Sequence, residues 1–171
     1  LAPALAAGCT VVLKPAEATP LCAVAMVKVF EDAGLPSGVV NLVTCSDPAP
    51  VGEVFVSDPR VRKLTFTGST AVGKMLAGRA AANMKRVSCE LGGHAPFLVF
   101  EDADPVHAAK GCQLVKFLNT GQDCISPNRI LVHRASIEPF VATLTERVAK
   151  MTAGSGFDEK VAIGPLINEA A

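Results

Sequence analysis

The stretch RKLTFTGSTAVGKMLAGRAAANMKRVSCEL, residues 62–91, predicts a strand, a helix and a second strand in direct succession. Residues 62–67 and 85–91 are rich in the β-branched and apolar side chains of half-buried strands. A helix is expected over residues 69–81, because Ser69 is a favoured capping residue in front of a helical apolar pattern. A strand, a helix and a second strand in this order favour a parallel sheet with a right-handed connection.

The same alternation continues on both sides of this unit. Upstream, a short helical fragment is expected at residues 1–8, strands at 9–14 and 38–44, and helices at 19–34 and 50–58. Downstream, strands are expected at residues 95–100 and 129–133, and helices at 105–117 and 136–151. The pattern predicts an α/β fold: a parallel, Rossmann-like sheet followed by the start of a second α/β domain. We expect the first domain over residues 1–92 and the second over residues 93–171.

The composition favours a folded protein that binds a small molecule. Hydrophobic residues make up 50% of the chain, and the 16 Lys and Arg residues balance the 16 Asp and Glu residues. No charged surface for nucleic acid or an anionic membrane is indicated, and the apolar stretches are too short to span a bilayer. The six cysteines show no CxxC spacing and the three histidines are far apart, so we expect no metal site and a reducing compartment.

The first polar cluster lies at the carboxyl end of the expected strand at residues 9–14. Lys14 and Glu17 flank Pro15 and Ala16 on a stiff turn, at the edge where parallel α/β sheets bind ligands. The two charged groups could grip a sugar diol, or they could form an ordinary exposed ion pair.

Two further clusters follow the strands of residues 62–67 and 85–91. In the turn at 67–73, Gly68 permits a tight bend and Ser69 offers a hydroxyl group at a helix N-terminus, which favours an anion. An ordinary helix cap is an equal alternative. Glu90 precedes two glycines and is either paired structurally or a catalytic base.

Cys124 is the candidate nucleophile among the cysteines, because it follows Gly121 and Gln122 in a polar loop, where reactive groups gather. Cys45 is also in a loop and stays ambiguous. The others lie in apolar strands or helices and are interpreted as small core residues: Cys9, Cys22, Cys89 and Cys112.

Four motifs stand in the order and at the spacing of the aldehyde dehydrogenase superfamily, namely KPAEATP (14–20), FTGSTAVG (66–73), ELGG (90–93) and GQDC (121–124). The chain resembles this superfamily along nearly its whole length, and most closely the succinate-semialdehyde dehydrogenase branch. The resemblance implies that the chain is an internal piece with a partial NAD-binding domain and a partial catalytic domain. The residues that it implies for cofactor binding are Lys14, Pro15, Ala16, Glu17, Gly52, Gly68, Ser69, Gly73 and Leu91.

The resemblance also implies NAD(P)-dependent oxidation of an aldehyde to the carboxylic acid. Cys124 would form a thiohemiacetal and then a thioester, and Glu90 would activate the water that hydrolyses it. NAD is favoured, with NADP possible, because a Glu17 carboxylate repels a 2′-phosphate. The family places an oxyanion-stabilising Asn upstream of residue 1, so we expect the isolated piece to be inactive.

Other roles stay open within the same resemblance. The chain could belong to an enzyme that passes the thioester to coenzyme A, or to a non-catalytic structural or nucleotide-binding member. The expected partner is a small-molecule aldehyde, in a homo-oligomer (dimer or tetramer) located in the cytoplasm, with the mitochondrial matrix as the alternative.

Three positions depart from the succinate-semialdehyde dehydrogenase pattern. Leu118 stands where that branch typically has an Arg that binds the substrate carboxylate, so a less charged or more apolar aldehyde becomes plausible. Ser126 replaces a second cysteine and excludes a disulfide with Cys124. His94, where the family usually has Lys, Asn or Leu, is expected to alter the nearby surface more than the chemistry.

Overall fold

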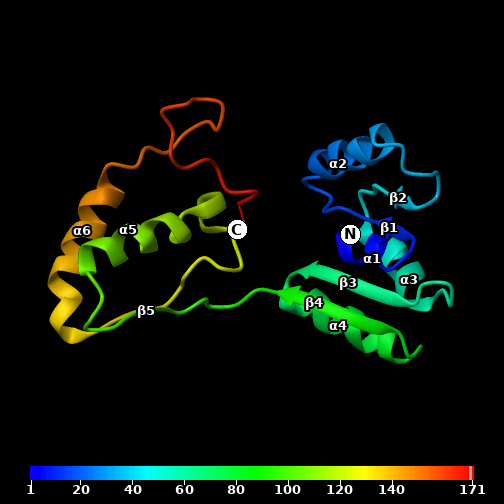
Figure 1. Cartoon of the computed structure of the whole chain (residues 1–171), viewed down its shortest axis with the longest axis horizontal. Coiled ribbons are helices and arrows are strands. Elements are labelled where there is room, and N and C mark those ends of the chain that lie inside the picture. Colours follow the sequence, from blue (N-terminus) through cyan, green and yellow to red (C-terminus); the bar gives the residue numbers. More distant parts are fainter. Residues whose placement is uncertain (170) are drawn as a thin grey trace. The chain divides into compact units, whose positions relative to one another are not determined.

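The computed structural model describes residues 1–169 and 171, which fold as two compact units (Figure 1). The first unit contains Leu1–Phe66 and Val72–Cys89, and the second contains Thr67–Ala71 and Glu90–Ala171. The division of the chain at Cys89 and Glu90 lies close to the expected boundary after residue 92. The assignment of the two domains to cofactor binding and catalysis stays a prediction.

Residues 1–91 alternate short strands with helices, and each element coincides with one expected from the sequence. The elements are α1 (Ala2–Ala6), β1 (Val11–Leu13), α2 (Leu21–Asp32), β2 (Val40–Leu42), α3 (Pro48–Ser57), β3 (Lys63–Gly68), α4 (Thr70–Ala81) and β4 (Arg86–Leu91). α2 gives way to a turn at Gly34, whose φ of 79° suits glycine. α3 begins at Asp47, whose side chain accepts a hydrogen bond from the Ala49 N–H at 3.0 Å.

The four strands of residues 1–91 form two separate pairs. β1 and β2 are parallel, with Val11 opposite Val40 and Leu13 opposite Leu42. β3 pairs with β4, and Figure 1 shows both arrows pointing the same way. The expectation of one sheet is therefore only partly met, because no ladder joins β2 to β3 within the described residues. In a doubly wound sheet, consecutive strands are not neighbours at the point where the strand order reverses.

The core of the first unit lies between α3, β3 and α4. It is formed by Val56, Leu64, Leu76 and Ala80, which are at most 9% exposed. This packing holds β3 against the two helices.

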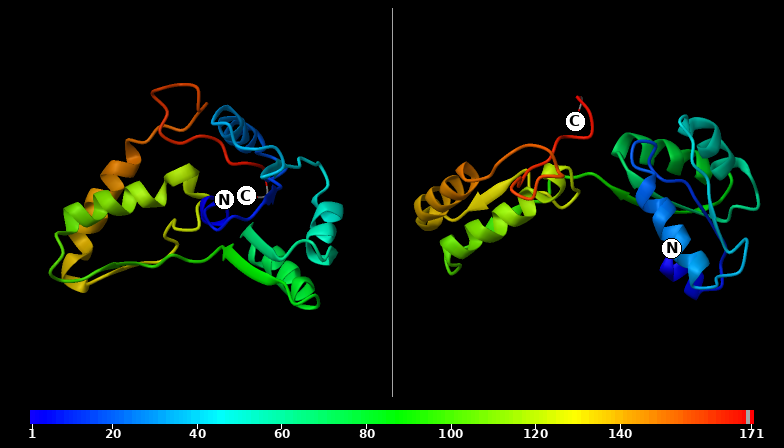
Figure 2. Two further views of the ribbon diagram at one scale, coloured as in Figure 1. Left: turned by 45° about the vertical axis from the view of Figure 1, so that its right-hand side comes forward. Right: turned by 90° about the horizontal axis from the view of Figure 1, so that it is seen from above.

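The second unit is a parallel strand pair covered by two helices. β5 (Phe97–Val99) pairs with β6 (Ile130–Val132), and α5 (Pro105–Lys116) lies beside α6 (Ile137–Ala149), as both views of Figure 2 show. Short helical turns, η1 (Leu118–Gly121) and η2 (Arg134–Ser136), precede the Cys124 loop and α6. The core of Val99, Ala109, Cys112 and Phe140 joins β5 to both helices.

The α/β class and the predicted order of elements are confirmed. The interpretation of four cysteines as core residues is correct for Cys112, where burial raises the pKa of the thiol. It is wrong for Cys9 and Cys22, which are exposed. Cys9 lies before β1, and Cys22 lies on α2, whose side chains all remain in contact with solvent, so the apolar pattern there corresponds to no buried face. Cys89 is half-buried.

Residues 1–169 and 171 contain no helix that is long and apolar enough to cross a membrane. In the same residues, the His, Cys, Asp and Glu side chains form no cluster of three that could hold a metal ion.

Candidate active site

Cys124 lies at an exposed turn between η1 and β6. The backbone before it runs through three residues in the left-handed region: Asn119 (φ 45°), Thr120 (φ 62°) and Gly121 (φ 83°). Asn and Gly adopt this region readily, but a β-branched residue such as Thr rarely does. A left-handed run of this kind costs free energy and persists only where surrounding contacts hold it.

The base of the Cys124 loop is fixed to the end of α5. Ser126 is 1% exposed, and its Oγ donates a hydrogen bond to the Lys116 carbonyl oxygen at 2.9 Å. The Lys116 ammonium donates to Asn128 Oδ1 at 3.0 Å. The Asp123 carboxylate accepts from the Ile125 N–H at 3.0 Å, which closes the turn around Cys124. An exposed thiol therefore stands on a loop whose base is buried and hydrogen-bonded.

Glu90 is the second-last residue of β4, and its side chain is exposed. The segment that leaves β4 is hydrogen-bonded to the Cys124 loop, because the Asn128 N–H donates to the His94 carbonyl oxygen at 2.9 Å. His94 is four residues after Glu90, and Asn128 is four residues after Cys124. The second unit thus ties together the two loops that contain the predicted catalytic side chains.

Gly68 and Ser69 leave the end of β3, and they belong to the same compact unit as Glu90 and Leu91. β3 and β4 point the same way in Figure 1, so their carboxyl ends meet at one edge. A helix, α4, begins directly at this edge, and the N-terminus of a helix favours an anion. The phosphate site expected here stays a prediction.

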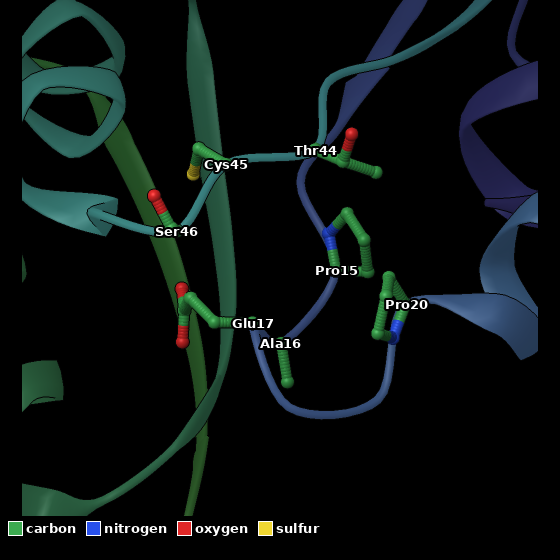
Figure 3. Close-up of a pocket in the computed structure, with 7 residues that line it drawn as sticks. All are labelled: Pro15, Ala16, Glu17, Pro20, Thr44, Cys45 and Ser46. Atoms are coloured by element: carbon green, nitrogen blue, oxygen red, sulfur yellow. The ribbon is translucent and has the colours of Figure 1, made fainter.

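Lys14 and Glu17 form an ion pair after β1, and Lys14 also donates a hydrogen bond to the Pro15 carbonyl oxygen at 2.7 Å. The Lys14 ammonium and the residue's own backbone N–H hold the pKa of Glu17 below its usual value. A pocket of about 280 Å³ adjoins this pair, lined by Pro15, Ala16, Glu17, Pro20, Thr44, Cys45 and Ser46 (Figure 3).

Figure 3 shows the Glu17 carboxyl and Ser46 hydroxyl groups extending to the same side of the pocket. Thr44, Cys45 and Ser46 line this pocket but were not among the residues expected there. They come shortly after β2, as Lys14 comes after β1, so their position beyond the carboxyl end of a strand could have indicated them.

Gly52 and Gly73 lie inside helices rather than at this pocket. A Cβ on Gly52 would lie 3.8 Å from Leu76 of α4, and Gly73 is itself a buried residue of α4. Both positions serve the packing of α3 and α4 in the structure, and their contact with a cofactor stays a prediction.

The sequence profile of the aldehyde dehydrogenase family matches residues 1–171. The chain belongs to the aldehyde dehydrogenase family. A probable NADP(+) succinate-semialdehyde dehydrogenase of Sinorhizobium fredii is 52% identical over 171 residues, which are 100% of this chain and 35% of the relative.

Solved aldehyde dehydrogenases have the same fold. A succinate-semialdehyde dehydrogenase from Burkholderia pseudomallei is 48% identical, with a TM-score of 0.92, and the match covers 98% of this chain and 35% of that one. A betaine aldehyde dehydrogenase mutant from Staphylococcus aureus in complex with NAD+ is 36% identical, with a TM-score of 0.90 over 99% of this chain and 34% of that one. The chain spans about a third of the length of these aldehyde dehydrogenases.

Proposed function

We propose that the protein containing this chain oxidises an aldehyde to a carboxylic acid with NAD(P), using Cys124 as nucleophile and Glu90 as base. The observation that supports this most directly is an exposed thiol on a hydrogen-bonded loop that is joined, through His94 and Asn128, to the strand end carrying Glu90. Family membership supports the same reaction.

Cys124 acts on the aldehyde carbon. Its Sγ, as thiolate, adds to the carbonyl to form a thiohemiacetal, and loss of a hydride from that carbon leaves a thioester. The turn closed by Asp123 and Ile125 keeps the thiol in contact with solvent, so a small substrate reaches Sγ directly.

Glu90 acts in the second half of the reaction. Its exposed carboxylate removes a proton from a water molecule, and the resulting hydroxide attacks the thioester carbon and expels the Cys124 thiolate. Gly92 and Gly93, which follow Leu91, have no side chains that could block this approach.

Each unit by itself offers residues that suit a part of nicotinamide adenine dinucleotide, which would supply the hydride acceptor when bound. In the first unit, the ionised Glu17 carboxylate would accept hydrogen bonds from a ribose diol beside the pocket of about 280 Å³. The remaining residues that we assign to this role are Lys14, Gly68, Ser69 and Leu91. We infer a preference for NAD, moderated by Lys14, whose charge offsets the repulsion between Glu17 and a 2′-phosphate.

The substrate that we favour is an aldehyde with a weakly charged or apolar substituent. Leu118 and Ile125, which stand before and after Cys124 in the sequence, are 39% and 54% exposed and offer apolar surface. Lys116, the cation at the end of the neighbouring helix, is hydrogen-bonded to Asn128. Succinate semialdehyde, named for the Sinorhizobium and Burkholderia relatives, is the second candidate. We further propose a homo-oligomer, a dimer or tetramer, located in the cytoplasm.

The deciding experiment uses the full-length protein with a panel of aldehydes and with NAD or NADP, followed by NAD(P)H absorbance. Cys124→Ser is expected to abolish NAD(P)H formation, because an alcohol is a far weaker nucleophile than a thiolate. Glu90→Gln is expected to release a burst of NAD(P)H equal to the enzyme concentration, followed by turnover slowed about 10²–10⁴-fold.

The two rival functions give different results in the same assay. A coenzyme A-acylating enzyme forms acyl-coenzyme A and depends on coenzyme A for steady turnover. A structural or purely nucleotide-binding protein forms no NAD(P)H with any aldehyde in the wild type. Either result would refute the hydrolytic reaction.

A further inference from the structure

Asn119 and Gln122 form a reciprocal amide clasp immediately before Cys124. The Asn119 Nδ2 group donates to the Gln122 carbonyl oxygen, and the Gln122 Nε2 group donates to the Asn119 carbonyl oxygen, each at 3.2 Å. The Gln122 N–H donates to the same Asn119 oxygen at 3.1 Å. Three hydrogen bonds thus join the two residues across the left-handed turn.

The clasp encloses the part of the loop that is least stable by itself. Thr120 stands inside it at φ 62° and ψ 26°, a conformation that a β-branched residue adopts only at a cost. Without the hydrogen bonds of Asn119 and Gln122, this backbone would relax toward the right-handed or extended region. The direction in which the chain enters Cys124 therefore depends on the clasp.

Gln122 also connects the loop to a distant segment of the second unit. Its Oε1 atom accepts a hydrogen bond from the Ile167 N–H at 3.0 Å. Thr120 Oγ1 donates to the Gly164 carbonyl oxygen at 3.4 Å, which ties the same turn to the same segment. Both ends of the Gln122 carboxamide are used, so the side chain cannot rotate without losing a bond on each side.

The chain is therefore anchored two residues before Cys124 and two residues after it. Gln122 anchors the chain before it, and Ser126, bonded to the Lys116 carbonyl oxygen, anchors the chain after it. The thiol itself stays exposed between these anchors.

We propose that Gln122 is a positioning residue: its carboxamide holds the left-handed turn, and thereby Cys124 Sγ, in the orientation for attack on the aldehyde carbon. This inference rests on the proposed role of Cys124 as nucleophile. Both amide functions of Gln122 bond to the protein, so in this role the residue affects the rate of the chemical step and leaves the binding of the cofactor unchanged.

The test compares three variants of the full-length protein. Gln122→Met keeps the length of the side chain and removes both amide functions. Gln122→Glu keeps an acceptor for the Ile167 N–H but loses the donor to Asn119. Gln113→Met is the matched control, because Gln113 bonds Arg147 across α5 and α6 at 2.6 Å, away from the Cys124 loop.

Loss of two hydrogen bonds is expected to lower kcat of Gln122→Met about 10-fold. The kcat of Gln122→Glu is expected to lie between the kcat of Gln122→Met and that of the wild type. In Gln122→Met the thiol remains exposed and its surroundings keep their charge. Three quantities are therefore expected to stay at wild-type values: the KM for the cofactor, the pH profile of kcat and the rate of Cys124 alkylation by iodoacetamide. Hydrogen exchange over residues 119–126 rises in both Gln122 variants. Gln113→Met lowers Tm and keeps the wild-type kcat.

Two failures are distinguishable. A wild-type protein that turns over no aldehyde would overturn the proposed function. An active wild type whose Gln122 variants keep the wild-type kcat would overturn this inference alone. The same holds if Gln113→Met loses as much kcat as the Gln122 variants at an equal loss of Tm, because the effect on kcat would then follow from lower stability.

Discussion

Gly121→Ala is the substitution whose cost can be worked out most directly from the Cys124 loop. Gly121 has a φ of 83°, a conformation that an alanine adopts only against repulsion between its Cβ and the backbone. A Cβ at this position would lie 3.4 Å from the Lys116 carbonyl oxygen, close to the limit of ordinary contact, and 3.9 Å from Ser126 Oγ. Because the space is nearly sufficient, the strain of the left-handed backbone is the main cost.

That strain is about 1–2 kcal/mol per residue for an L-amino acid. Gly111→Ala is the matched control, because Gly111 lies within α5 and nothing stands within 4 Å of a Cβ built there. In a helix, alanine is about 0.5–1 kcal/mol more favourable than glycine. The same chemical change is therefore expected to destabilise the protein at residue 121 and to stabilise it at residue 111.

The assay is urea unfolding of the full-length variants, followed by circular dichroism, together with steady-state kinetics. Gly121→Ala is expected to unfold at lower urea and to lose kcat, since the turn before Cys124 must open to relieve the strain. Gly111→Ala is expected to unfold at higher urea with unchanged kcat. Equal midpoints for the two variants, or a gain of stability in Gly121→Ala, would refute the left-handed assignment of the loop.

Two further predictions concern acidic side chains. Asp104 accepts hydrogen bonds from the His107 and Val106 N–H groups at the start of α5, which lowers its pKa. This stabilisation is present above the pKa of Asp104 in the unfolded chain and is lost as the pH falls through its folded-state pKa. Asp104→Ala is therefore expected to lower Tm at neutral pH and to match the wild-type Tm in strong acid. Thermal unfolding across pH checks this, and a Tm deficit that does not change with pH contradicts it. Glu17→Gln removes the charge beside the Lys14 ammonium and is expected to raise the kcat/KM ratio of NADP to NAD about 10-fold; an unchanged ratio would exclude Glu17 as a selectivity residue.

Much of the fold follows from local sequence patterns. The helix of residues 105–117 was predictable because Asp104 and Pro105 begin it and apolar residues recur along it, and α5 runs from Pro105 to Lys116 as expected. The loop position of Cys124 was predictable for the same kind of reason, since Gly121, Gln122 and Pro127 interrupt the apolar pattern. Such features depend on residues within a few positions of one another.

Burial and pairing were decided by the tertiary structure. Cys9 and Cys22 have apolar neighbours in sequence but are exposed, whereas Cys112 packs against β5 and α6, because burial depends on which elements meet. Periodicity alone also did not reveal that β2 and β3 belong to separate strand pairs in the described chain.

The sequence by itself determined the α/β alternation, the polar groups at the ends of the strands and the candidate pair Glu90 and Cys124. Only the tertiary structure decided how the Cys124 loop is held. Its contacts come from Ile167, 45 residues from Gln122, and from His94, bonded to Asn128. Hydrogen bonds over such separations form only after the chain between them has folded, so no local pattern of residues encodes them.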